Sequence, residues 1–129
     1  MKKQANNQAR NSNNNKILSE EQRVRKILGQ FERKRETYLG DRTLAASIDT
    51  QQHNAAVCRK FLEFAARHFK KVSEIKYITQ DHYAHWIQFR RREGISGETR
   101  RKDAYILDTF FKAAGLDIHV NPQRQLDKP

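Results

Sequence analysis

The stretch that decides the fold reads REGISGETRRKDAYILDTFFKAAGL and covers residues 92–116. Ser96 is a preferred helix N-cap and Gly115 suits the left-handed position just after a helix, so the pattern predicts a helix between them. The first turns of this helix carry three cations, Arg100, Arg101 and Lys102. Its trailing half carries apolar side chains at helical spacing, namely Ile106, Leu107, Phe110, Phe111 and Ala114. One end of such a helix can anchor in a bundle while the other approaches phosphates.

Three further helices are predicted upstream from caps and apolar spacing. The first is expected over residues 19–39, where Ser19 and Gln22 can form a capping box. The second is expected over residues 50–71, with two lysines on the favourable side of the helix dipole at its end. The third is expected over residues 79–93 and ends in three consecutive arginines.

The fold class follows from the spacing of the apolar residues. No stretch keeps the apolar–polar alternation of a strand, so the sequence predicts an all-α fold, a small bundle of four to five helices. Its core is expected to draw on eight apolar side chains, Val57, Phe61, Phe64, Trp86, Ile87, Ile106, Leu107 and Phe110. The helix over residues 19–39 is either a further element packed outside this bundle or a separate arm.

Composition divides the chain into four segments. Residues 1–16 hold six asparagines and almost no apolar side chains, so they are expected to form a disordered tail. Residues 17–48 are expected to form a basic N-terminal helix or arm, and residues 49–116 the main helical domain. Residues 117–129 are interpreted as a linker.

The charge balance points to an anionic partner. The 129-residue chain has a formal net charge of +11, of which residues 1–48 carry +6 and residues 49–115 carry +5. Positive charge over both helical segments favours a polyanion through its field and through counterion release. The alternative interpretation is a soluble basic protein without such a partner.

Several classes of function find no support in the sequence. The single cysteine, Cys58, excludes an internal disulfide, lies in an apolar helical stretch and suits a reducing compartment. No apolar run reaches the roughly 20 residues of a membrane span, and no signal peptide opens the chain, so an intracellular protein is expected. The five histidines lack the cluster that a metal site needs, and no nucleophile sits beside a base. We therefore predict no enzyme activity, no metal and no cofactor.

The cations near the decisive stretch form two groups around one turn. Arg90, Arg91 and Arg92 end one predicted helix, and Arg100, Arg101 and Lys102 begin the next. The link between the helices is only a few residues long, so both groups are expected to converge on one edge, together with the free N–H groups of the second helix. Such an edge would bind phosphates; the alternative is two solvated faces that point apart.

An ordered series of motifs runs through the same region. It comprises Thr50, Asn54, Cys58, Phe61 and Phe64 in one helix, then Ile78-Thr79 and the aromatic helix Tyr83–Phe89, then Gly94, Ser96, Thr99 and the pair Phe110-Phe111, and finally Asn121-Pro122, Leu126 and Pro129. This series resembles the N-terminal core-binding domain, a SAM-like helical module, of tyrosine recombinases of the phage integrase family. Asn54 departs from the pattern, because an aromatic residue is usual there.

The resemblance implies a function in site-specific recombination and DNA integration by a mobile genetic element. The core-binding domain would grip double-stranded DNA near the crossover site, and a catalytic domain, to which nothing in this chain corresponds, would clamp the other face. Other partners would be neighbouring recombinase subunits, and the location would be the bacterial cytoplasm at the nucleoid. The DNA contacts would come from Ser96, Thr99, Arg100, Arg101 and Lys102, from Arg90, Arg91 and Arg92, and from Arg59 and Lys60.

Two other functions stay open at this stage. One is a freestanding helical DNA-binding accessory protein of a mobile element, which would bind specific DNA tightly by itself. The other is a SAM-like protein-interaction module, which would show no salt-dependent DNA binding.

Overall fold

The computed structural model describes residues 18–39 and 47–121 of the chain. These residues form five α-helices and one short 3-10 helix and include no strand, which confirms the all-α prediction. The elements are α1 (Glu20–Arg33), α2 (Arg35–Leu39), α4 (Ile48–His68), η2 (Ile75–Tyr77), α5 (Gln80–Arg92) and α6 (Gly97–Ala113). The predicted disordered tail, residues 1–16, and the last eight residues of the predicted linker lie outside the described part.

The caps predicted from the sequence occur in the structure. Ser19 and Gln22 form a reciprocal capping box, with N···O distances of 3.2 and 2.9 Å. The Ser96 hydroxyl accepts a hydrogen bond of 3.1 Å from the backbone N–H of Thr99. Gly115 follows α6 with a φ of 73°, the left-handed conformation that favours glycine.

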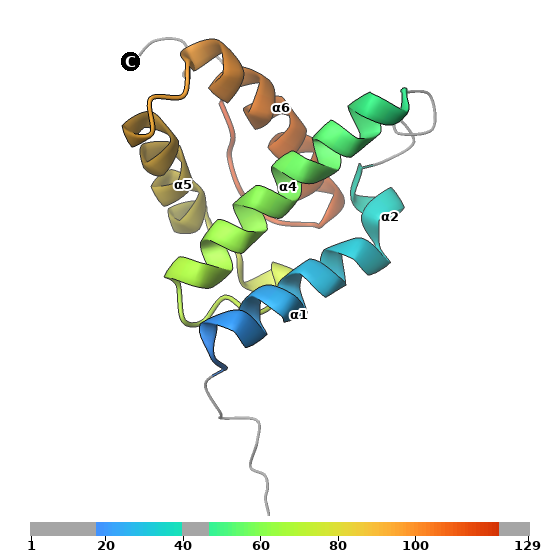
Figure 1. Cartoon of the computed structure of the whole chain (residues 1–129), viewed down its shortest axis with the longest axis vertical. Coiled ribbons are helices and arrows are strands. Elements are labelled where there is room, and N and C mark those ends of the chain that lie inside the picture. The colour runs from blue at the N-terminus through green and yellow to red at the C-terminus, as the bar shows by residue number, and fades with distance from the viewer. Residues whose placement is uncertain (1–17, 40–46, 122–129) are drawn as a thin grey trace, which may run out of the picture.

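The long helix α4 is the centre of the bundle, and α1 packs along it (Figure 1). Ile27 and Phe31 of α1 are fully buried in the shared core. Arg23 is buried as well, and its Nε donates a 2.8 Å hydrogen bond to the carbonyl of Ala66 near the end of α4. The helix α1 is packed against the bundle, and its apolar face forms part of the same core as the 49–116 segment.

The helix predicted over residues 19–39 is interrupted. Lys34 ends α1 with φ −123° and ψ 24°, and α2 starts at the next residue. Neither proline nor glycine occupies the break; the change of direction brings Tyr38 into the core. There its ring stacks on Phe31 at 5.9 Å and meets the edge of Phe110 at 5.2 Å between centroids. This tertiary packing explains why helical spacing alone did not reveal the break.

An aromatic cluster fills the space between α4, α5 and α6. Phe61 of α4 contacts Trp86 of α5 and Phe111 of α6 at centroid distances of 5.7 and 5.4 Å. Of the eight predicted core residues, five are buried and three, Phe64, Ile87 and Ile106, pack partly buried against them. Cys58 is fully buried, as its apolar surroundings predicted, and this burial raises the pKa of its thiol to about 12.

After α6 the chain runs back behind α4 as an extended segment over residues 116–121 (Figure 1). Ile118 is buried, and the Gln80 side chain at the start of α5 bonds both backbone groups of His119, at 3.0 and 2.7 Å. This part of the predicted linker is therefore packed on the bundle. No helix among the described residues has the length and apolar character to cross a membrane.

Candidate nucleic-acid interface

The two groups of cations are brought together by a tight turn between α5 and α6. The N–H of Ile95 donates to the carbonyl of Arg90 at 3.2 Å, and Gly94 adopts a φ of 79°. The end of α5 and the start of α6 are thus adjacent. Burial lowers the pKa of Arg100, and the like charges of Arg91 and Arg90 lower it further.

Arg90 does not extend into solvent, although the sequence suggested a DNA contact. It is 9% exposed, forms a 2.5 Å ion pair with Asp103 of α6 and lies over the Trp86 ring at 5.0 Å. Tyr83, Trp86 and Arg90 share one face of α5, and that face is turned to the core. Arg90 therefore joins α5 to α6 and is removed from the set of surface contacts.

Arg100 is likewise buried, at 3% exposure, and this corrects its assignment as a phosphate contact. Its Nε donates a 3.0 Å hydrogen bond to the carbonyl of Ile95 in the turn. The reason is its helical position, because Arg100 lies in line with the buried residues Ala104, Leu107 and Phe111. The buried Arg100 side chain therefore stabilises the turn between α5 and α6.

The cations that remain at the surface are Arg91, Arg92, Arg101 and Lys102. Arg91 and Arg101 are partly exposed, their Nε atoms are buried without a hydrogen-bond partner, and neither forms an ion pair with a described carboxylate. Arg92 is exposed, and Lys102 makes only a long exposed contact of 3.8 Å with Glu98. Because such exposed pairs contribute little, this edge keeps most of its positive charge.

The hydroxyl groups of Ser96 and Thr99 lie at the same edge. Both residues are exposed, and their hydroxyls bond each other at 3.0 Å while Ser96 caps α6. The first N–H groups of the 17-residue helix α6 therefore face the cationic edge and add the positive end of its dipole.

The pair Arg59 and Lys60 separates. Arg59 turns toward α1, where its guanidinium bonds Glu32 at 2.9 Å, so it does not reach the α5–α6 edge. Lys60 is exposed and lines the cleft between α4 and α5, together with Arg90. Of the two, Lys60 alone borders the cationic edge.

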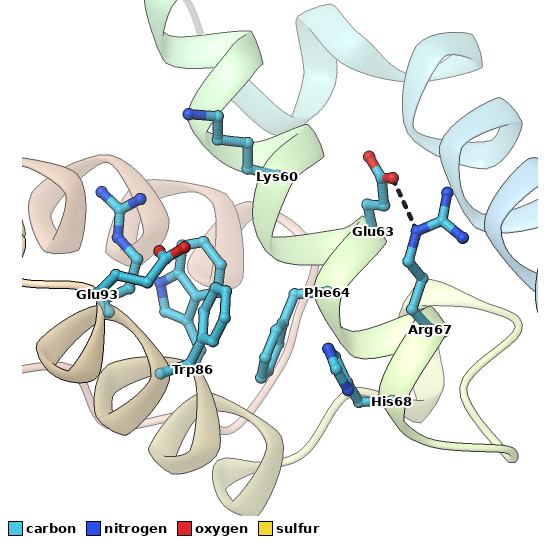
Figure 2. Close-up of a pocket in the computed structure, with 9 residues that line it drawn as sticks. Lys60, Glu63, Phe64, Arg67, His68, Trp86 and Glu93 are labelled. Carbon is cyan, nitrogen blue, oxygen red and sulfur yellow. Dashed lines mark hydrogen bonds and ion pairs between the residues drawn. The ribbon is translucent and has the colours of Figure 1, made fainter.

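A cleft of about 290 Å³ lies between α4 and α5 beside Lys60 (Figure 2). Its apolar wall consists of Phe64, Trp86 and Phe89, and the rings of Phe64 and Phe89 stack on each other at 4.9 Å. The rest of the lining is charged or polar, namely Lys60, Glu63, Arg67, His68, Arg90 and Glu93. Glu63 bonds Arg67 at 2.9 Å, on the side of α4 away from α5 in Figure 2. Arg90, which lies over the Trp86 ring, also lines this cleft.

Histidines do not gather into a metal site in the part of the chain that the structure describes, where no three His, Cys, Asp or Glu side chains could hold an ion. His82 and His85, at i and i+3, are engaged locally. His82 Nδ1 accepts from the N–H of Thr79 at 3.0 Å, and His85 Nδ1 lies 2.9 Å from the carbonyl of Asp81.

Asp103 is a functional residue that the sequence analysis did not single out. It is 6% exposed and pairs with Arg90. Its position, one helical turn before Leu107, was a signal that it faces the core.

Comparison of the chain with models of protein families, with curated proteins and with solved structures found no match.

Proposed function

We propose that this chain binds duplex DNA through the edge formed by the end of α5 and the start of α6, as the core-binding module of a tyrosine recombinase. The contact residues in this proposal are Arg91, Arg92, Arg101 and Lys102, with Ser96, Thr99 and Lys60 at the border. The recombinase assignment rests on the motif series in the sequence; the binding surface rests on the geometry of the cations.

One observation carries the proposal: Arg91, Arg92 and Arg101 gather at this edge, and none of the three forms an ion pair with a described carboxylate. Arg91 and Arg101 have no described ion-pair partner, and burial, followed by the like charges of Arg91 and Arg90, lowers the pKa of the neighbouring Arg100. Cations at a helix N-terminus also oppose the helix dipole. A bound polyanion would offset both costs, because phosphates would neutralise the cations and release their own counterions.

The two buried arginines support this role indirectly. Arg90 bonds α6 through Asp103, and Arg100 bonds the turn through Ile95. Together they hold the turn in one conformation, so the surface cations are preorganised for a rigid phosphate backbone and lose less entropy on binding. Contacts with the phosphate backbone of DNA position a protein on the duplex but do not distinguish one base sequence from another.

The test is a salt series of duplex-DNA titrations with the variant Arg92→Ala/Arg101→Ala/Lys102→Ala, followed by fluorescence anisotropy. Loss of three phosphate contacts should make the log–log salt slope shallower by about 2–3 units and weaken binding at low salt. The parent protein should bind with micromolar to submillimolar affinity, roughly the range of non-specific contacts. Circular dichroism verifies that the helices remain folded.

A matched control removes the same charge from α1. Arg25, Arg33 and Lys34 are exposed, so replacing all three with alanine lowers the net charge equally but leaves the α5–α6 edge intact. We expect its slope to stay close to that of the parent. If the salt slope of DNA affinity becomes shallower in the α1 variant and stays at the parent value in the α5–α6 variant, the binding face lies on α1. If the parent shows no salt-dependent binding, the DNA proposal is wrong and a protein-interaction module becomes the better interpretation.

A further inference from the structure

An open hollow of about 580 Å³ lies between the loop that follows α4 and the start of α5. Its lining combines two lysines with three hydroxyl groups and an imidazole, and none of the described lining residues is acidic; they are Leu18, Lys70, Lys71, Ser73, Tyr77, Thr79 and His82. Lys70, Lys71, Tyr77 and Thr79 are exposed, so these side chains are accessible to a partner in solution.

The loop that carries these residues is held in one conformation. Buried Val72, Ile75 and Ile78 alternate with the lining residues and anchor the loop in the core. The N–H of Val72 donates to the carbonyl of Phe69 at 3.0 Å, and the N–H of Tyr77 donates to the carbonyl of Glu74 at 3.0 Å. The hollow is therefore a built feature of residues 69–79.

The two lysines of the hollow keep their charge. Neither Lys70 nor Lys71 forms an ion pair with a described carboxylate. Glu74, the one acid within residues 69–79, is held by α1, where Lys26 and Gln30 bond its carboxylate at 3.3 and 3.5 Å. The loop thus presents accessible cations and takes its own acid out of their reach.

The exposed face of α5 joins this hollow to the α5–α6 edge. Five exposed residues recur at i, i+3, i+4, i+7 and i+11 and form one stripe along the helix, namely Asp81, Ala84, His85, Gln88 and Arg92. The helix runs from the loop after α4 to the turn before α6 (Figure 1). Its 13 residues span about 20 Å at the rise of an α-helix.

This separation and this chemistry fit the backbone of duplex DNA. A length of about 20 Å corresponds to roughly six base pairs, so a duplex that lies along α5 presents phosphates to both ends of the helix. Lysine ammonium groups and hydroxyl groups both donate hydrogen bonds to phosphate oxygens. His82 adds a donor, because its Nδ1 accepts the N–H of Thr79 and the neutral ring then carries its proton on Nε2.

We infer that Lys70 and Lys71, with the hydroxyls of Tyr77 and Thr79, form a second phosphate-binding patch, and that one duplex runs along the exposed face of α5 from this loop patch to the α5–α6 edge. The inference rests on the proposed function and extends it, because the loop patch lies outside the edge. Contacts at both ends of one helix set the orientation of the duplex as well as its position.

The experiment titrates the full chain and its variants with duplex DNA longer than the roughly six base pairs that α5 spans, at several salt concentrations. Lys70→Gln/Lys71→Gln should weaken binding at low salt and make the log–log salt slope shallower by about 2 units, since each phosphate contact contributes about 0.9. Arg33→Gln/Lys34→Gln is the matched control, because it removes two exposed cations from the end of α1. Its slope should stay close to that of the parent.

A second variant tests the path along α5. Asp81 is the single acid of this helix, and its exposed carboxylate would face the duplex between the two patches. Asp81→Asn should therefore raise duplex affinity about two- to fivefold, the scale of one interaction between exposed charges. Asp49→Asn removes an exposed acid from the corresponding first turn of α4 and should leave the affinity near that of the parent.

The outcomes separate this inference from the proposed function. If Lys70→Gln/Lys71→Gln keeps the affinity and slope of the parent while the α5–α6 variant loses binding, the loop patch is wrong and the proposed function stands. If the loop variant loses binding and the α5–α6 variant does not, the loop patch is right and the proposed edge is wrong. Equal effects of Asp81→Asn and Asp49→Asn would contradict the path along α5. A parent protein that ignores duplex DNA would overturn both proposals.

Discussion

At the scale of single residues, the structure divides six neighbouring cations into two kinds. Arg90 and Arg100 are buried beneath the turn, whereas Arg91, Arg92, Arg101 and Lys102 remain at its surface. The sequence predicted that all six lie close together. It did not separate them, because the partner that draws Arg90 inward, Asp103, is set by the crossing of two helices. The alignment of Arg100 with Leu107 was readable beforehand.

The buried pair gives the first stability prediction. Asp103→Ala leaves the Arg90 charge buried without its partner and should lower the free energy of unfolding by about 3 kcal/mol or more. Asp108→Ala, on the same helix but in a pair with the exposed Lys112, should cost below about 1 kcal/mol. Urea denaturation measures both.

The double variant Arg90→Met/Asp103→Leu should recover much of the free energy of unfolding that Asp103→Ala loses, because apolar side chains of similar size avoid the desolvation of two charges. Equal midpoints for Asp103→Ala and the parent would show that Arg90 finds solvent or another partner.

At the scale of elements, His82 couples the start of α5 to pH. Its Nδ1 accepts the N–H of Thr79, which requires an unprotonated nitrogen, and burial lowers the pKa of His82. The unfolded state therefore takes up the proton first. The stability from this cap is present above the ordinary histidine pKa of about 6.5 and is lost as the pH falls below it.

His82→Gln tests this coupling, because glutamine is a natural capping-box residue and does not titrate. Chemical denaturation at a series of pH values should show the variant gaining stability relative to the parent as the solution is acidified through pH 6. If the difference in free energy of unfolding between variant and parent stays constant across the pH series, protonation of His82 does not act on the cap.

The helix α1 is the element whose role the sequence left open. Its capping box and apolar stripe were predicted, but which surface the stripe covers depends on α4, α2 and α6 together. Phe31→Ala should lower the free energy of unfolding by about 3–5 kcal/mol, because Phe31 is fully buried. Arg25→Ala, at an exposed position of the same helix, should change it little. If both variants unfold like the parent, α1 is an arm after all.

At the scale of the whole molecule, composition and periodicity predicted the all-α class, the caps and most of the core. The packing of residues 116–121 on α5 was not foreseen, because a single side chain, Gln80, secures it through backbone groups that carry no sequence signature. The short link between helices predicted that all six cations converge on one edge, whereas Arg90 and Arg100 are buried beneath the turn. The consequence for function rests on the surface arginines that no described acid neutralises.

The central claim is that the α5–α6 edge is the DNA-binding face, and amide NMR shifts map it most directly. Short duplex DNA is added to the labelled full chain at low salt, where non-specific contacts are strongest. We expect the largest shifts over residues 91–102, with smaller ones near Lys60, and their reversal as salt is added. Shifts concentrated on the basic side of α1, or none over residues 91–102 while duplex still binds, would contradict the account.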